Sequence, residues 1–411
     1  MMKILEILGS GQIGITANDP GSNIVCELSN NFVHLGHDVT IADVKSNKER
    51  NLLDSRVKVF EANVPSPHLD TKIRKLIILN KLVRKTLSYS HLYPHYQYLC
   101  GLIPHYKYVR EVATKLRLDS YDIIHVQHGQ HAIFLLKLYH KSYVYTNHWQ
   151  YSPNDNNLDA RIERMVIRGA RTAVGVGSYL KLFEPLANHV IIPHGIDPEK
   201  WKPLGRKECR EVLGISEKDF IVVFVGRVDH GKGVDILLKA IQSLTSQYKH
   251  FRLYIIGNLS PNKYSTNVSS YAHKLIEQSK GSPVYFLGFM DNMSMEFRRY
   301  LSAADVFVLP SRWEAQGLVV LEALAMGLPA IVSDVGGLGE MINKEIGYTF
   351  KSEDSEELAQ IIQHLCDDSK QLETLQKNCR NYVEKHYSWK SVALRYIDAF
   401  RDCIDVQVLT H

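Results

Sequence analysis

The chain has 411 residues, of which 45% are hydrophobic and 23% are charged. Such a composition is ordinary for a globular protein and excludes disordered and fibrous chains, and the length predicts two domains because one domain usually takes roughly 100–200 residues. The apolar runs are shorter than the roughly 18 residues that a membrane span needs, and residues 1–9 predict a first strand rather than a signal peptide. The six cysteines lie far apart without a C-x-x-C pair, which argues against a disulfide framework or a zinc ribbon and favours a cytoplasmic location.

The charge is spread unevenly along the chain. Residues 1–190 carry 23 Lys and Arg against 16 Asp and Glu, a net charge of +7, whereas the remaining residues carry 26 against 28, a net charge of −2. The basic first half indicates either an anionic partner or an ordinary solvated surface.

Short apolar runs alternate with segments of helical periodicity from one end of the chain to the other. In the first half we expect strands at 3–8, 38–44, 57–61, 122–127, 142–146 and 172–176, and helices at 22–35 and 158–169. In the second half we expect strands at 220–226, 251–257, 284–288, 305–309 and 329–333, and helices at 233–248, 317–326 and 355–367. The alternation predicts parallel sheets with helices on both faces, and because it runs twice it predicts two doubly wound α/β domains that meet near the Pro- and Gly-rich segment 193–205.

Two cations follow the first strand of the second half. Gly226 and Arg227 end the run FIVVFVGR, and Lys232 comes five residues after Arg227, before the next helix. Two cations at the mouth of a parallel sheet can clamp a pyrophosphate, and flanking glycines allow the backbone to approach it. The alternative interpretation is a solvated loop.

A second cluster follows the run that ends at Pro310. Glu314 lies in the loop, Gly317 opens a helix, and Glu322 lies on that helix among apolar neighbours. Free amides at 317–319 predict an anion site at the helix N-terminus. A buried Glu needs a partner or a ligand, so Glu322 indicates either hydrogen bonds to sugar or ribose hydroxyls or a structural ion pair.

Together these segments resemble the donor domain of glycosyltransferase family 4, the retaining enzymes of the two-domain GT-B fold that are also called glycosyl transferases group 1. Order and spacing agree over about 190 residues. The pieces that carry the resemblance are Gly226-Arg227 with Lys232, Gly233 and Asp235; Glu314 with Glu322; the segment Asp334 to Glu340; PHGID at 193–197; and VYFLGFM at 284–290.

The resemblance implies roles for individual residues. Arg227 and Lys232 would hold the nucleotide diphosphate, Glu322 would bind the ribose, and Glu314 would face the donor sugar. Gly226, Gly317 and Leu318 would complete the nucleotide-sugar site. His194 stands where the family usually has Asn. Gln316 stands where the family often has Phe, and because the resemblance places this residue against the sugar pocket, the identity of the donor sugar stays open.

The first strand is followed by Gly9-Ser10-Gly11-Gln12-Ile13-Gly14, which fits the G-x-G-x-x-G pattern of dinucleotide binding. The helical pattern starts only near Ser22, and Asp43 follows Gly14 by 29 residues rather than about 20, so we do not expect an NAD or FAD site. In the family the first glycine-rich loop faces the donor phosphates, and by this resemblance Gly14 belongs to the nucleotide-sugar site.

Histidines cluster after the strands of the first half. His125, His128 and His131 lack a carboxylate or Cys at ligand spacing, and no D-x-D follows an apolar run, so we expect no metal site and no cofactor. His148 follows the run YVYTN, and the resemblance places it against the donor sugar as a catalytic-site residue. Its alternative interpretation is a capping or surface histidine.

Two further segments are predicted to be helical. Residues 69–88 form a basic amphipathic pattern that indicates either a membrane-surface patch or a packed helix with a solvated basic face. Residues 388–406 form a last helix, and the resemblance implies that residues 387–411 cross back to the first domain.

We therefore expect a GT-B protein with an acceptor-side domain at 1–192 and a donor-binding domain at 193–386, facing a central cleft. Its predicted reaction transfers a hexosyl group from a nucleotide diphosphate sugar, UDP favoured, to a hydroxyl acceptor with retention and without a metal. The expected partners are a lipid-linked or anionic acceptor and an anionic membrane surface on the cytoplasmic side. We do not expect a nucleic acid as a partner. The alternatives are a GT-B nucleotide-sugar epimerase or phosphorylase, an NAD-dependent oxidoreductase and an inactive scaffold subunit.

Overall fold

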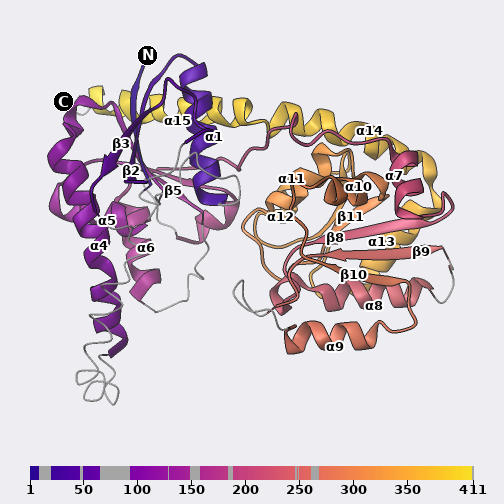
Figure 1. Ribbon diagram of the computed structural model, residues 1–411. Helices are drawn as coiled ribbons and strands as arrows, with labels where there is room; N and C mark the ends of the chain where they lie inside the picture. The colour runs from indigo at the N-terminus through magenta and orange to yellow at the C-terminus, as the bar shows by residue number, and fades with distance from the viewer. Residues whose placement is uncertain are drawn as a thin grey trace. The chain divides into compact units, whose positions relative to one another are not determined.

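The computed structural model describes residues 1–8, 20–46, 50–64, 93–127, 129–148, 158–183, 188–245, 248, 250–260 and 268–409. The chain forms two compact units, drawn in Figure 1. Unit 1 consists of residues 1–193 and 392–411, and unit 2 consists of residues 194–391. Within the described ranges, no helix is both long and apolar enough to cross a membrane.

Unit 1 is built on a parallel sheet of seven strands in the order β3-β2-β1-β4-β5-β6-β7. Its strands are β1 Lys3–Ile7, β2 Asp38–Val44, β3 Lys58–Ala62, β4 Ile123–Val126, β5 Val144–Asn147, β6 Thr172–Gly175 and β7 His189–Ile191. Its helices are α1 Pro20–His34, α4 Tyr93–Lys115, η1 Leu118–Ser120, α5 Gly129–Leu138, α6 Leu158–Gly169 and η2 Ser178–Phe183, together with the larger part of α15 Trp389–Leu409.

Helices cover both faces of this sheet. The ring of Phe32 in α1 packs against those of Tyr396 and Phe400 in α15, with centroids 6.3 and 5.7 Å apart. Figure 1 shows α4, α5 and α6 grouped together, and Tyr108 of α4 donates from its hydroxyl to the carbonyl of Ala42 in β2 over 2.6 Å. Burial raises the pKa of the Tyr108 phenol, as expected for a hydroxyl enclosed in the core.

Unit 2 is built on a parallel sheet of six strands in the order β10-β9-β8-β11-β12-β13. Its strands are β8 Phe220–Val225, β9 Phe251–Ile256, β10 Val284–Gly288, β11 Val306–Leu309, β12 Ala330–Ser333 and β13 Gly347–Phe350. Its helices are α7 Arg206–Leu213, η3 His230–Lys232, α8 Val234–Thr245, α9 Ser270–Gln278, α10 Met295–Ala303, α11 Leu318–Ala325, α12 Leu338–Met341, α13 Ser355–Asp367 and α14 Ser369–His386. The two parallel sheets with helices between their strands confirm the prediction of two doubly wound α/β domains.

Among the described elements that the sequence analysis did not name are the strands β7 and β13 and the helix α4, and each of these three has a physical reason. The strands β7 and β13 span only three and four residues, too few to show a periodicity. The helix α4 contains Pro104, a residue that normally ends or kinks a helix. The predicted basic helix at 69–88 lies outside the described residues.

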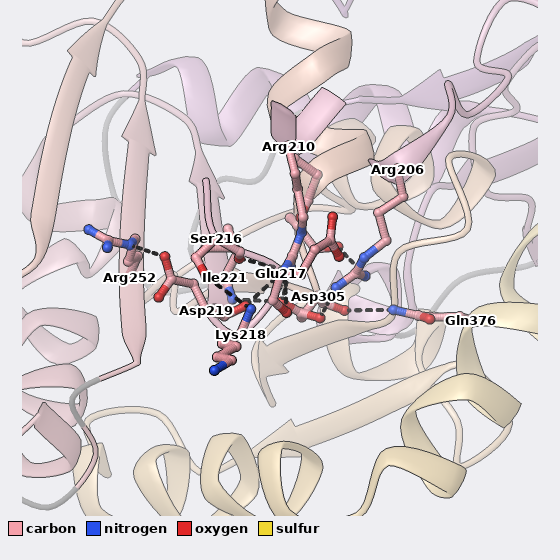
Figure 2. A network of polar contacts seen from close by, with 12 residues as sticks. Arg206, Arg210, Ser216, Glu217, Lys218, Asp219, Ile221, Arg252, Asp305 and Gln376 are labelled. Atoms are coloured by element: carbon pink, nitrogen blue, oxygen red, sulfur yellow. Dashed lines mark hydrogen bonds and ion pairs between the residues drawn. The ribbon is translucent and has the colours of Figure 1, made fainter. Parts of the chain in front are cut away.

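A buried ionic network fastens the amino-terminal edge of the sheet in unit 2 (Figure 2). Asp305 precedes β11 and accepts hydrogen bonds from the Ile221 amide of β8 over 2.7 Å and from Nη2 of Arg210 over 2.8 Å. The Arg210 side chain is only 1% exposed, and Arg206 pairs with the other carboxylate oxygen of Asp305. The remaining nitrogens of Arg210 donate to the carbonyls of Ala303, Ser216, Glu217 and Asp219. Because each charge is paired and hydrogen-bonded, we interpret this network as structural.

Candidate functional site

The candidate site of unit 2 lies at the opposite, carboxyl-terminal edge of the sheet. The strands β9 and β10 are added on one side of β8, and β11, β12 and β13 are added on its other side. The order of the strands therefore reverses between β8 and β11. Doubly wound sheets bind ligands outside the carboxyl ends of their strands at such a switch point. The loops that follow β8, β11 and β12 meet there, and they contain the residues that the sequence analysis assigned to the donor.

The loop after β8 is held in shape by Asp229. Its side chain caps η3 by accepting a hydrogen bond from the Lys232 amide over 3.1 Å, and its other carboxylate oxygen lies 3.0 Å from Nη1 of Arg227. Arg227 is 73% exposed, so its guanidinium is accessible to an anion. Gly233 follows with a φ of +65°, and a Cβ there would lie 1.9 Å from the carbonyl oxygen of Pro310. Only glycine therefore lets this loop pack against the end of β11.

Gly226 has a packing role in the same region. Its amide donates to the carbonyl of Ile256 over 3.0 Å, and a Cβ on Gly257 would lie 1.7 Å from its carbonyl oxygen. The two glycines thus bring the ends of β8 and β9 together and leave Arg227 at the rim.

Lys232 and Glu314 form an ion pair at this edge, from residues 82 positions apart in the chain. Their side chains are 20% and 18% exposed, so the pair is partly shielded from water and less screened than a surface pair. Asp229 pairs with Arg227, whereas Glu314 is the partner of the Lys232 ammonium. A ligand phosphate would have to share or replace that partner.

Arg312 joins the loops after β8 and β11, and the sequence analysis missed it. Its guanidinium contacts both oxygens of Asp235 at 2.9 Å, and its amide donates to the carbonyl of Gly231 over 2.8 Å. Burial would raise the pKa of Asp235, but hydrogen bonds from Arg312 and Tyr271 outweigh that effect and lower it to about 2. The only sequence signal for this anchor was a charged residue placed directly after a strand.

Glu322 lies on α11, which begins at Leu318 after the N-cap residue Gly317. Gly317 adopts a φ of +78° and offers no capping side chain, so the first amides of α11 have no side-chain cap. Burial raises the pKa of the Glu322 carboxyl to about 8, opposed by a hydrogen bond from the Asn292 side chain. The carboxyl is therefore mostly protonated at neutral pH and can donate as well as accept a hydrogen bond.

The side chain of Gln316 forms hydrogen bonds with the backbone of His194 in unit 2. Its oxygen accepts from the His194 amide over 2.6 Å, and its nitrogen donates to the His194 carbonyl over 3.1 Å. Both residues are buried, and burial lowers the pKa of the His194 imidazole to about 4. The two positions that depart from the family pattern therefore contact each other, because the amide of Gln316 brackets the backbone of His194.

The site residues predicted in unit 1 lie at the carboxyl end of its own sheet. His148 follows β5, and its Nε2 lies 2.6 Å from the side-chain oxygen of Gln127. His125 is fully buried with its Nδ1 2.8 Å from Glu6, and His131 lies 3.0 Å from a nitrogen of His105. These contacts give His125 and His131 structural partners, whereas Gly14 and His128 lie outside the described residues.

Comparisons with known proteins relate unit 2 to a family of transferases. Residues 205–385, which lie within unit 2, match the family model of the glycosyl transferases group 1. An uncharacterized glycosyltransferase of Methanocaldococcus jannaschii is 28% identical over 198 residues, which cover 48% of this chain and 48% of that protein. The chain thus spans about half the length of the first curated relatives that it matches.

Solved structures match over nearly the whole chain. A sucrose-phosphate synthase from Thermosynechococcus elongatus superposes with a TM-score of 0.71 at 21% identity, covering 99% of this chain and 100% of that chain. The HepE protein of Anabaena in complex with UDP and glucose gives a TM-score of 0.67 at 17% identity, covering 98% and 100%. The chain therefore has the GT-B fold, and its residues 205–385 carry the similarity to the glycosyl transferases group 1.

Proposed function

We propose that the protein transfers a hexosyl group from a nucleotide diphosphate sugar to a hydroxyl acceptor, with retention at the anomeric carbon. The observation that carries the proposal is the Lys232–Glu314 ion pair at the switch point of unit 2, next to the accessible guanidinium of Arg227. The match of residues 205–385 to the glycosyl transferases group 1 supports it. A UDP-sugar is the favoured donor, consistent with UDP and glucose in the HepE structure.

In the proposed reaction, negative charge grows on the leaving diphosphate as the C1–O bond breaks. Arg227, Lys232 and the first amides of α11 would neutralise this charge at the place where it develops. Preorganised donors of this kind typically contribute on the order of 10²–10³ in rate each. Binding of the diphosphate by Lys232 would release Glu314 from its ion pair, and Glu314 could then face the donor sugar, as the resemblance implies.

The remaining roles follow from the resemblance. Glu322 would bind the ribose hydroxyls, and its largely neutral carboxyl suits a site that both donates and accepts. His148 would contact the donor sugar. We expect the same-face transfer to need no metal and no cofactor, with the leaving phosphate itself taking the proton of the acceptor.

The acceptor is proposed to be lipid-linked or anionic. The net charge of +7 on residues 1–190 supports this, because in the family the acceptor side belongs to the first domain. We further propose that the protein works in the cytoplasm at an anionic membrane surface. The comparisons do not favour the epimerase or oxidoreductase alternatives, since the family match is to glycosyl transferases.

The test is a thermal-shift panel of UDP-, ADP- and GDP-sugars, followed by product analysis with the donor that binds. A true donor at 100 times its Kd should stabilise the protein by about 2.7 kcal/mol. Formation of an epimer from the sugar nucleotide alone would support the epimerase instead. Absence of stabilisation by every nucleotide sugar would contradict the proposal.

A further inference from the structure

The guanidinium of Arg312 has an acceptor within unit 2 for each of its N–H groups. Its Nε and Nη2 donate to the two carboxylate oxygens of Glu353, over 2.5 and 3.0 Å. Its Nη1 and Nη2 donate to the two oxygens of Asp235, each over 2.9 Å, and Nη1 also donates to the carbonyl of His230 over 2.6 Å. A guanidinium has five N–H donors, so the protein uses all of them and leaves none for a phosphate.

The acceptors of Arg312 lie on both sides of Lys232 in the chain. His230 and Gly231 precede Lys232, and their carbonyls accept from Nη1 and from the backbone amide of Arg312, over 2.6 and 2.8 Å. Asp235 follows Lys232 and lies in the first turn of α8. Arg312 therefore fixes the backbone of this loop before and after the lysine.

Two side chains from other elements orient this arrangement. Tyr271 of α9 donates from its hydroxyl to Asp235 over 2.6 Å. Glu353 lies between β13 and α13 with a φ of +72°, although it is not a glycine, and its side chain is 59% exposed. Such a left-handed backbone costs free energy and persists only where its surroundings hold it, often at functional sites. We interpret the bidentate contact with Arg312 as the interaction that holds Glu353 in this conformation.

Arg312 also belongs to the loop that carries Glu314, two residues further along the chain. Glu314 is the partner of the Lys232 ammonium. Arg312 thus ties together the two loops that supply this ion pair, and its own side chain is only 18% exposed. A shorter or differently shaped side chain at this position would let the two loops move relative to each other.

We propose that Arg312 is a positioning residue for the donor diphosphate: it fixes the loop that carries Lys232 without contacting the diphosphate, and Glu353 orients its guanidinium. The role toward the diphosphate rests on the proposed glycosyl transfer, whereas the hold on the loop does not. Arg312 differs in this from Arg227, whose guanidinium is 73% exposed and accessible to an anion.

Hydrogen exchange followed by mass spectrometry on the full chain tests the hold on the loop without a ligand. Arg312→Lys keeps the charge but has three donors in place of five. We expect residues 229–235 of this variant to exchange about tenfold faster than in the wild type, the equivalent of one lost hydrogen bond. Glu353→Gln should accelerate the same exchange by about threefold, because an exposed ion pair contributes less.

Glu356→Gln is the matched control. Glu356 is an exposed acid in the first turn of α13, three residues after Glu353, so this variant removes a charge from the same region without touching Arg312. Its exchange at residues 229–235 should stay within about twofold of the wild type.

Titration with UDP, followed by NMR so that millimolar affinities are measured, tests the role toward the diphosphate. Arg312→Lys should weaken UDP binding by about tenfold in the otherwise unchanged protein. In the Lys232→Ala background the same change should weaken it by less than about twofold, because Arg312 acts through Lys232. A residue that only stabilised the fold would lower the melting temperature and leave the UDP affinity of the folded protein unchanged.

Three results would overturn the inference. One is loop exchange in Arg312→Lys or in Glu353→Gln that equals the wild type, and the second variant decides this even if the first does not fold. Another is an equal loss of UDP affinity in both backgrounds, which would make Arg312 a direct ligand of the diphosphate. The third is an unchanged UDP affinity in Arg312→Lys. If the wild type binds none of UDP, ADP and GDP, the glycosyl transfer and the diphosphate role are refuted together, while the exchange still decides the hold on the loop.

Discussion

Replacing Glu322 by Gln tests the burial of this carboxyl through the pH dependence of stability. The folded-state pKa is about 8 against 4.5 for the ordinary group, so the unfolded chain loses this proton first as the pH rises. Stability from the protonated carboxyl is therefore complete below about pH 4.5 and lost as the pH rises toward 8. One pKa unit corresponds to about 1.4 kcal/mol, so the total loss approaches about 5 kcal/mol.

Gln mimics the neutral carboxyl at every pH. We therefore expect the stability advantage of Glu322→Gln over the wild type to be small, about 1 kcal/mol, near pH 5 and to grow by roughly 4 kcal/mol up to pH 8.5. Urea unfolding followed by tryptophan fluorescence at a series of pH values measures this, since Trp201, Trp313 and Trp389 all lie in unit 2.

A control variant separates this effect from a general change of charge. Glu373 on α14 has a side chain that is 66% exposed, and Glu373→Gln should change the free energy of unfolding by less than about 0.5 kcal/mol at every pH. If the difference between Glu322→Gln and the wild type is the same at pH 5 and pH 8.5, the reasoning from burial is wrong. Calorimetry on Glu322→Leu, which removes both the donor and the acceptor, should show nucleotide affinity weakened by about tenfold for one lost hydrogen-bond partner. Unchanged affinity with a lowered melting temperature would instead make Glu322 a structural residue.

Four further predictions concern other parts of the molecule. Arg227→Ala or Lys232→Ala should lower kcat/KM on the order of 10²–10³-fold while the circular dichroism spectrum stays native. Near-normal turnover of both variants would contradict the proposal that these two cations hold the donor diphosphate. Arg210→Ala should destabilise unit 2 by about 3–5 kcal/mol in urea unfolding because it removes a buried partner of Asp305, whereas Lys207→Ala on the exposed side of α7 should cost less than about 0.5 kcal/mol. Activity should survive EDTA, and its full loss with recovery on adding Mn²⁺ or Mg²⁺ would contradict the metal-independent mechanism. In a flotation assay the protein should bind anionic liposomes at low salt and dissociate at high salt, since charge attraction is screened over roughly 10 Å at 0.1 M. Absence of binding at low salt, or binding that is unaffected by changing Arg74, Lys81 and Lys85 to Glu, would contradict the membrane proposal.

The sequence by itself determined the class of fold and the edge of the sheet on which the candidate site lies. Apolar runs such as 220–226 and 305–309 fall on β8 and β11 because buried parallel strands need continuous apolar residues, and this requirement is local. Arg227, Lys232 and Glu314 were singled out because they lie in the loops that follow such runs. The resemblance added their order and spacing, which a single motif could not supply.

Only the tertiary structure decided which of these residues are partners. Lys232 and Glu314 are 82 positions apart, Gln316 and His194 are 122 apart, and Gln127 and Glu6 are 121 apart. The first and third pairs meet because neighbouring strands of a parallel sheet come from distant parts of the chain, and Gln316 meets the backbone of a segment that precedes α7. No local pattern encodes such pairs. The raised pKa of Glu322 likewise depends on atoms supplied by other elements, since burial is a property of the packed unit and not of a residue type.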